Sequence, residues 1–244
     1  MKKFFFVLGL GLTLTSFSAP NKVSIVTLPD GSAASPSLCF ASDPSSGFFM
    51  TNGVVCLSVH GSVVAAFDKN RNVALAGATI GPSSSDSLAA GRGSQANSDC
   101  AIALGQKAYV GAYDGVSLGH NNYLDVPAIA SFAAGTDNYI NAPYATTIGD
   151  GNEIYVSAIG ATAIGAGNLI GENALTDRGQ YSATFGLGNQ TLGVACFASG
   201  TLLGNRGDNS ALFGKGVGSR NLLINNLIGV IGVGYNTTSP VVFP

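Results

Sequence analysis

The chain has 244 residues and is unusually rich in glycine, with 34, while charged residues make up only 10% and the net charge is −2. A hydrophobic share of 46% excludes a disordered chain, glycines without a three-residue period exclude collagen, and the absence of a basic excess excludes an ordinary nucleic-acid-binding protein. So low a share of charged residues also argues against a monomeric, soluble globular protein.

The N-terminal segment, residues 1–20, begins with two lysines and continues with an apolar stretch over residues 4–14. Small residues around Ser18 follow this stretch, which is the plan of a secretory signal peptide. The stretch is too short to predict a transmembrane helix. The alternative is an apolar segment that is retained and attaches the chain to a virion, and the sequence leaves both interpretations open.

Residues 21–71 are expected to form a small β-rich connector. Asp43-Pro44 and Gly47 interrupt apolar runs, and further apolar residues flank His60-Gly61. This punctuation predicts strand, turn, strand, turn, strand. His60 is therefore interpreted as a polar turn residue rather than a member of a catalytic triad.

A short phrase of small and aliphatic residues that ends in glycine recurs eleven times between residues 73 and 232. Successive glycines lie 14, 14, 14, 16, 14, 16, 21, 14, 14 and 18 residues apart. The departures from 14 are all longer, as insertions into a fixed coil would produce. The repeat glycines are Gly77, Gly91, Gly105, Gly119, Gly135, Gly149, Gly165, Gly186, Gly200, Gly214 and Gly232.

The residue two positions before each glycine is nearly always Ala, Ser or Thr, and the one directly before it is usually larger. This alternation is typical of a short strand with one face in a narrow core. Fourteen residues allow two strands and two tight turns, so residues 72–234 predict an all-β fold, a parallel β-solenoid, followed by a C-terminal tail over 235–244. Because such a thin coil buries little apolar area, we expect three chains to associate as a homotrimer.

Two resemblances extend this interpretation. The phrases at residues 101–105, 161–165 and 182–186 resemble the head repeats of trimeric autotransporter adhesins (the YadA-type head), which implies a left-handed parallel β-roll in a homotrimer. Residues 35–49, a proline-containing strand followed by an Asp-x-x-x-Gly turn and two phenylalanines, resemble a segment of bacteriophage tail-fibre and other virion fibre proteins. No heptads precede the last repeat, and residues 233–244 are too short for the barrel anchor of the adhesins, which favours a virion fibre.

Tyr109, Tyr123 and Tyr139 each follow a repeat glycine by four residues and are expected to stack in one column. They predict an aromatic ladder that supports the sheet. The alternative is an exposed tyrosine stripe that contacts a receptor sugar or protein.

The longest insertion, residues 166–181, contains Glu172, Asp177 and Arg178. Loops that protrude from a rigid scaffold commonly carry recognition. We therefore expect these three residues, with the tyrosine stripe, to form the receptor-binding surface.

Cys39, Cys56, Cys100 and Cys196 include no C-x-x-C pair, so they are expected to be buried free thiols, with disulfides as the alternative for an extracellular protein. No catalytic, cofactor or metal site is expected.

Other polar residues also have structural interpretations. His120 follows a repeat glycine and is interpreted as a polar turn residue. Asp114-Gly115 and Asp150-Gly151 predict β-turns rather than calcium sites.

Together these features predict a non-enzymatic structural protein of a phage particle, a tail or head fibre. It would bind other virion proteins through its N-terminal region and a glycan or protein on the host surface, without binding nucleic acid. The alternative is a secreted or surface bacterial trimeric adhesin. A polysaccharide depolymerase is disfavoured because the chain has only two glutamates to supply paired carboxylates.

Overall fold

The computed structural model describes residues 27–172, 178–216, 223–225, 231–235 and 241–243. All regular structure in these residues is β, as the repeat predicts, and no helix occurs among them. The chain divides into two compact units between Lys69 and Asn70, two residues before the expected boundary. The N-terminal segment 1–20 and most of the C-terminal tail lie outside the described residues.

The first unit contains four antiparallel strands, β1 (Leu38–Phe40), β2 (Asp43–Thr51), β3 (Val54–Val59) and β4 (Ser62–Phe67). Two-residue turns join β2 to β3 at Asn52-Gly53 and β3 to β4 at His60-Gly61, and all four turn residues have positive φ. This is the type I′ geometry that suits the twist of a hairpin. The predicted alternation of strands and turns, with His60 in a turn, is confirmed.

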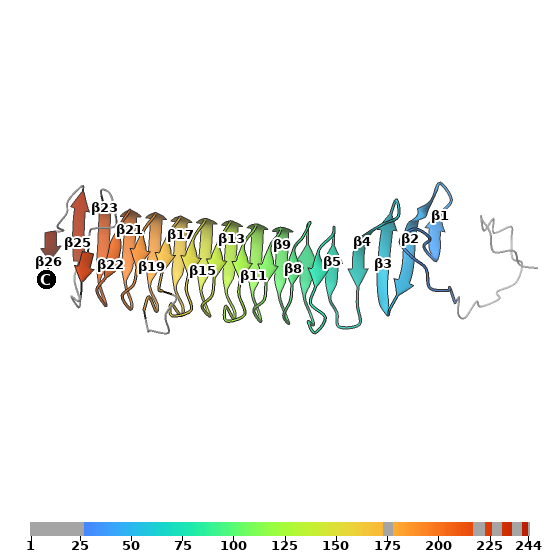
Figure 1. The fold of residues 1–244 in the computed structure, drawn as a ribbon, viewed down its shortest axis with the longest axis horizontal. Coiled ribbons are helices and arrows are strands. Elements are labelled where there is room, and N and C mark those ends of the chain that lie inside the picture. Colours follow the sequence, from blue (N-terminus) through green and yellow to red (C-terminus); the bar gives the residue numbers. More distant parts are fainter. Residues whose placement is uncertain (1–26, 173–177, 217–222, 226–230, 236–240, 244) are drawn as a thin grey trace, which may run out of the picture. The chain divides into compact units, whose positions relative to one another are not determined.

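The second unit is a β-solenoid in which each coil contributes one long strand and one short strand to two parallel sheets (Figure 1). The long strands are β5 (Val73–Leu75), β7 (Leu88–Ala90), β9 (Ile102–Gln106), β11 (Val116–His120), β13 (Phe132–Thr136), β15 (Thr146–Asp150), β17 (Thr162–Ala166), β19 (Ala183–Leu187), β21 (Phe197–Thr201), β23 (Ala211–Lys215) and β25 (Ile231–Tyr235), with β26 (Val241–Phe243) antiparallel to β25. The short strands are β6 (Thr79–Ile80), β8 (Gln95–Ala96), β10 (Tyr109–Val110), β12 (Tyr123–Leu124), β14 (Tyr139–Ile140), β16 (Glu153–Ile154), β18 (Leu169–Ile170), β20 (Gln190–Thr191), β22 (Gly204–Arg206) and β24 (Leu223–Asn225).

The two terminal repeat phrases are out of phase with the others. The register pairs Leu75 with Ala90, so Ala76, not Gly77, aligns with the next repeat glycine. At the other end Gly214 pairs with Gly234 rather than with Gly232. The prediction was wrong at both ends because backbone hydrogen bonds set the register there, and the short glycine phrase alone does not distinguish neighbouring glycines.

The internal repeat glycines stack directly on one another along the solenoid. Their φ angles lie between +107° and +150°, where residues with a side chain are strained. A Cβ atom on Gly105, for example, would overlap the carbonyl oxygen of Gly119 in the next coil. Glycine is therefore required both by the backbone conformation and by the close approach of the coils.

The core of the solenoid lies between the two sheets. The small residue two positions before each glycine points inward, as with Ala103, Ala133 and Ala163, which are fully buried. Facing them are larger side chains from the short strands, which the sequence prediction did not single out. These are Val110, Leu124, Ile140, Ile154 and Ile170.

A ladder of five buried asparagines runs through the same core and was not anticipated from the sequence. Each asparagine after the first, Asn122, donates a hydrogen bond from its side-chain Nδ2 to the Oδ1 of the asparagine one coil before it, at 2.9–3.1 Å. Each Nδ2 also donates to the carbonyl of a stacked repeat glycine. The members are Asn122, Asn138, Asn152, Asn168 and Asn189.

The two corners of each coil differ in length. The connection from a long strand to the following short strand has two residues in every coil from β9 to β22. The connection from a short strand to the next long strand, here called the long corner, has five residues in regular coils, seven at 125–131 and 155–161, and twelve at 171–182. All these insertions therefore fall at one corner, where extra residues do not disturb the stacking.

Candidate interaction surfaces

The predicted tyrosine column is confirmed on the outer face of the short-strand sheet. Tyr109 pairs with Tyr123, and Tyr123 with Tyr139, in the parallel register. The first two rings stack with their centroids 4.3 Å apart and 5° between their planes, and the next pair stacks at 5.8 Å. Because the faces of these rings pack against one another, the column offers mainly ring edges and hydroxyl groups to a partner.

Carboxylates line this column. The Tyr139 hydroxyl donates to Asp125 at 3.3 Å, and the Tyr155 hydroxyl donates to Glu153 at 2.8 Å. This geometry is that of an aromatic ladder, the structural interpretation of the three tyrosines. Receptor binding by Tyr109, Tyr123 and Tyr139 stays a prediction.

Stacking also changes the acidity of the column. Burial, followed by the hydrogen bond and charge of neighbouring Tyr109, raises the pKa of Tyr123 from its usual 10 to about 12. Since the folded state then retains a proton that the unfolded state loses, this contribution to stability is complete below pH 10 and disappears as the pH rises through 12. In denaturant unfolding, we expect the free energy of unfolding of the wild type to fall between pH 10 and pH 12. That of Tyr123→Phe should fall less. An equal fall in both proteins would contradict the prediction.

The structure moves the predicted insertion toward its C-terminal half. Residues 166–170 form a regular part of the coil, because Asn168 continues the asparagine ladder and Ile170 the core. The additional residues follow Gly171. Arg178 Nε lies 3.1 Å from Glu172 Oε1, so an ion pair joins the two ends of this segment, while Asp177 lies outside the described residues. Receptor binding by Glu172, Asp177 and Arg178 also stays a prediction.

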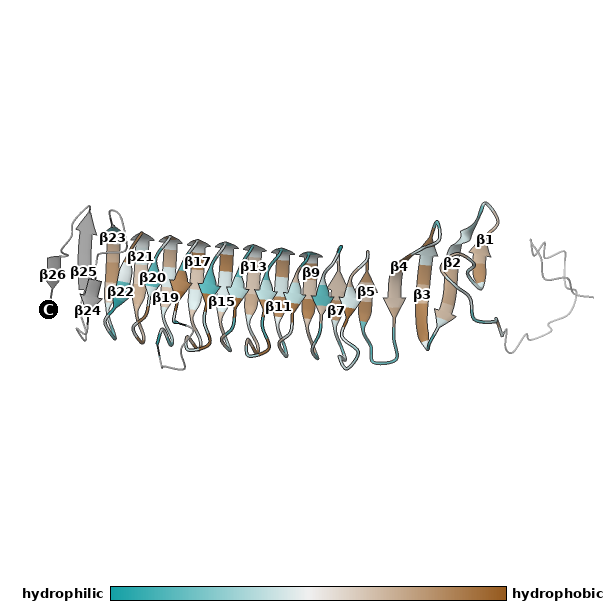
Figure 2. Cartoon of the chain, viewed as in Figure 1, coloured by the Kyte–Doolittle hydropathy of each residue, from teal (hydrophilic) through white to brown (hydrophobic). Residues whose placement is uncertain are grey.

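On the outer face of the long-strand sheet, two columns of side chains over ten successive strands, β5 to β23, are mostly apolar and contain no charged residue. Figure 2 shows apolar residues recurring from strand to strand along this sheet. Most of these side chains are half-buried, and Ile148 is 41% exposed. The first column is Val73, Leu88, Ile102, Val116, Phe132, Thr146, Thr162, Ala183, Phe197 and Ala211, and the second is Leu75, Ala90, Leu104, Leu118, Ala134, Ile148, Ile164, Phe185, Ser199 and Phe213.

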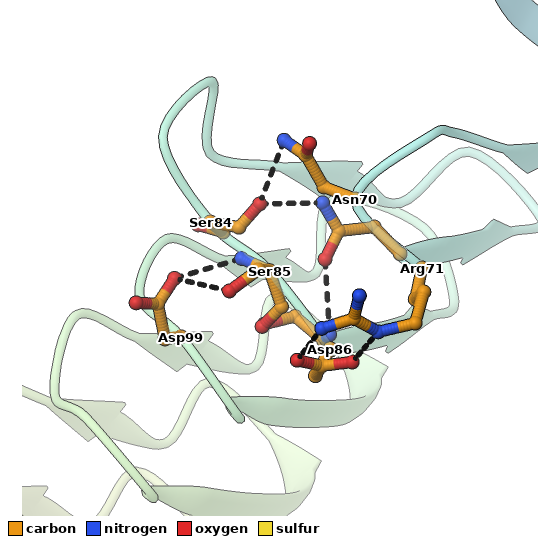
Figure 3. A network of polar contacts seen from close by, with 8 residues as sticks. Asn70, Arg71, Ser84, Ser85, Asp86 and Asp99 are labelled. Atoms are coloured by element: carbon orange, nitrogen blue, oxygen red, sulfur yellow. Dashed lines mark hydrogen bonds and ion pairs between the residues drawn. The ribbon is translucent and has the colours of Figure 1, made fainter.

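The first coils of the solenoid carry a network of polar contacts (Figure 3). Arg71 forms a two-pronged ion pair with Asp86, which holds the pKa of that carboxyl below its usual range. Asp99 Oδ1 accepts hydrogen bonds from the backbone N–H and the hydroxyl of Ser85, at 2.8 and 3.0 Å. Each carboxylate thus has a partner one coil away, and the network ties successive turns together.

The four cysteines are free thiols, but only Cys56 and Cys196 are buried. Cys39 is exposed and Cys100 is partly exposed, so the expectation of burial was wrong for these two. Cys196 occupies the position of a small residue in the stacked column that also holds Ser182, whose hydroxyl accepts a hydrogen bond from the Cys196 N–H at 3.0 Å. Packing by a small side chain accounts for its presence there.

The two histidines lie in the different units. His60 Nδ1 is 2.9 Å from Asp43, whose carboxylate also accepts hydrogen bonds from Ser45 and Ser46 and stabilises the adjoining turns. His120 is exposed at the end of β11, a strand position rather than the expected turn, because β11 continues one residue beyond the repeat glycine. Asp114 lies in a turn, as predicted, and Asp150 ends β15.

Within the described ranges, no group of three or more His, Cys, Asp and Glu side chains is arranged to hold a metal ion. No helix long and apolar enough to cross a membrane was found in that part of the chain. No protein-family model matches this sequence, and no curated protein matches it. The interaction surfaces are therefore the basis for a functional proposal.

Proposed function

We propose that this chain is one of three identical subunits of a virion fibre, a tail or head fibre that projects from a phage particle and adheres to the host surface. The two mostly apolar, uncharged columns on the outer face of the long-strand sheet are the observation that supports it. Ten strands spaced by about 4.8 Å extend this face over roughly 43 Å. Monomeric soluble proteins rarely expose so long an apolar surface. Packing three such faces around one axis buries them and closes the assembly.

The first unit offers a second surface for assembly. Its sheet exposes the apolar side chains of Phe48, Met50, Val55 and Phe67, which lie in neighbouring positions of β2, β3 and β4. This face fits the proposed attachment of the N-terminal region to other virion proteins.

Adhesion by a trimer would present three copies of a weak site and gain avidity from their effective concentration.

Charge on the apolar face tests the assembly. We expect light scattering to give the mass of three chains for the wild type and of one chain for Leu104→Lys/Ile148→Lys, because six ammonium groups would otherwise be buried around one axis. Asn121→Lys is the control, since Asn121 is exposed and the equivalent position of the previous coil is Lys107. A monomeric wild type at micromolar concentration would overturn the proposal.

The source of the chain tests the virion role. Mass spectrometry of purified phage particles should detect the chain with its N-terminal residues 1–18 intact. A chain that is instead processed near Ser18 and found in the medium or on the cell surface would support the alternative, a bacterial trimeric adhesin. That alternative is retained because residues 1–18 have the plan of a signal peptide.

A further inference from the structure

We propose that Tyr144 and Tyr181, on the long corner of the solenoid, form a platform that binds an uncharged saccharide chain. This inference rests on the proposed adhesive function and assigns a ligand class to a surface outside the predicted stripe. The two side chains are 65% and 67% exposed, more than any other aromatic residue among the described ones.

The backbone places these two tyrosines in one column. The Tyr144 N–H donates to the Ile129 carbonyl, the Gly160 N–H to the Pro143 carbonyl, and the Tyr181 N–H to the Ile159 carbonyl. Tyr144, Gly160 and Tyr181 therefore occupy equivalent positions in three successive coils. Neighbouring coils are about 4.8 Å apart, so the two tyrosines are anchored roughly 10 Å apart along the solenoid.

Gly160 shows how one ring is held. In this column the backbone is left-handed in every coil, and Ala130, Tyr144 and Ala195 adopt it with φ of 52–59°. Gly160, at φ 67°, therefore holds a position where side chains are tolerated. A Cβ atom on it would lie 3.0 Å from Cδ1 and 3.3 Å from Cε1 of Tyr181. The absence of that atom leaves room for the Tyr181 ring beside Gly160, where 67% of the residue stays exposed.

An exposed tyrosine ring on a surface of little net charge suits a sugar. The C–H groups on one face of a pyranose pack against the electron-rich face of an aromatic ring, and the tyrosine hydroxyl supplies a hydrogen bond at the edge. The corner residues 126–131, 141–145 and 156–161 contain no charged side chain, and the two charged side chains in the described part of 171–182, Glu172 and Arg178, form an ion pair. This surface therefore carries little net charge to attract a polyanion or a charged peptide. In the stacked column, by contrast, the Tyr123 ring has a stacked tyrosine on each side.

The insertions reinforce this choice of surface. Every additional residue of the coils from β9 to β22 falls at the long corner, and Tyr181 closes the longest of these insertions. Side chains at such positions are displayed by a rigid scaffold without changing its core. The long corner thus combines two exposed tyrosine side chains with an environment of little net charge.

The test uses the full-length protein on an array of neutral bacterial surface polysaccharides and of hexasaccharides of glucose and of N-acetylglucosamine. We expect the wild type to bind at least one of them, and Tyr144→Ala and Tyr181→Ala each to weaken that binding about tenfold, roughly the effect of losing one stacked ring. Gly160→Ala should weaken it too, because the new methyl group displaces the Tyr181 ring. Lys107→Ala, at the opposite corner, should bind as the wild type does.

Absence of binding by the wild type, or equal binding by all variants, would overturn the saccharide proposal. A change of oligomeric mass in Tyr144→Ala or Tyr181→Ala would also overturn it, since the corner would then be an interface between copies. Light scattering on the same samples separates this failure from that of the proposed function: a wild-type trimer that binds no sugar leaves the fibre proposal standing, whereas a sugar-binding monomer removes it.

Discussion

Gly135→Ala should destabilise the solenoid by about 4 kcal/mol or more, enough to prevent folding of a marginal coil stack. Gly135 has φ +119°, and a Cβ atom there would overlap the carbonyl oxygen of Gly149, a backbone atom that cannot move aside without opening the sheet. Circular dichroism and thermal unfolding would measure the effect. A melting temperature equal to that of the wild type would show that the coils are not stacked this closely.

The control is Gly151→Asn, a glycine substitution two residues beyond the adjacent repeat glycine, Gly149. Gly151 also has a positive φ, 60°, but a Cβ atom on it meets nothing within 4 Å. Equivalent positions in the two preceding coils hold Asn121 and Asp137 at φ 53°. We therefore expect a change within about 1 kcal/mol, which would separate close packing from the general cost of replacing glycine.

Asn152→Ala should cost about 3 kcal/mol of unfolding free energy. Asn152 lies in the middle of the ladder, where its Oδ1 accepts hydrogen bonds from the N–H and the Nδ2 of Asn168. Its Nδ2 donates to Asn138 Oδ1 and to the carbonyls of Ile148 and Gly165. Removing the amide leaves several buried groups without partners, and each has lost its access to water. Denaturant unfolding would measure the difference.

Asn121→Ala provides the comparison for this variant. Asn121 is next to a ladder residue in sequence, yet its side chain is exposed and makes one hydrogen bond, to Asp137. Exposed pairs of this kind contribute little, but the left-handed backbone of Asn121, φ 53°, is less favourable for alanine than for asparagine, so we expect a loss of about 1 kcal/mol. Similar losses for Asn152→Ala and Asn121→Ala would mean that the ladder is not a cooperative buried network.

The glycine period by itself determined most of the architecture. A five-residue phrase that recurs every fourteen residues leaves no room for a helix, and its small residues two positions before glycine predicted the inward face, as buried Ala103 and Ala163 confirm. The stacking of Tyr109, Tyr123 and Tyr139 followed from the same period. These features are local or strictly periodic. Because equivalent residues of successive coils stack on one another, a period in the sequence becomes a column of side chains in space.

The asparagine ladder could have been found from the same period, because an asparagine follows the repeat glycine by three residues in five successive coils. Asparagine is, however, a common turn residue, so its position in the phrase did not indicate burial. Only the backbone path shows that it points between the sheets, where each Oδ1 meets the amide of the next coil.

The tertiary structure alone decided the register at the ends, the corner that accepts insertions, and the exposure of Tyr144 and Tyr181. The reason is physical. A repeat phrase determines which residues are neighbours in adjacent coils. It does not determine at which corner the chain accepts extra residues or which side chains are exposed there. Those features depend on the left-handed corner residues and on local packing, such as that of Tyr181 beside Gly160. Sequence therefore determined the coil, and the folded backbone determined the surfaces that the coil presents.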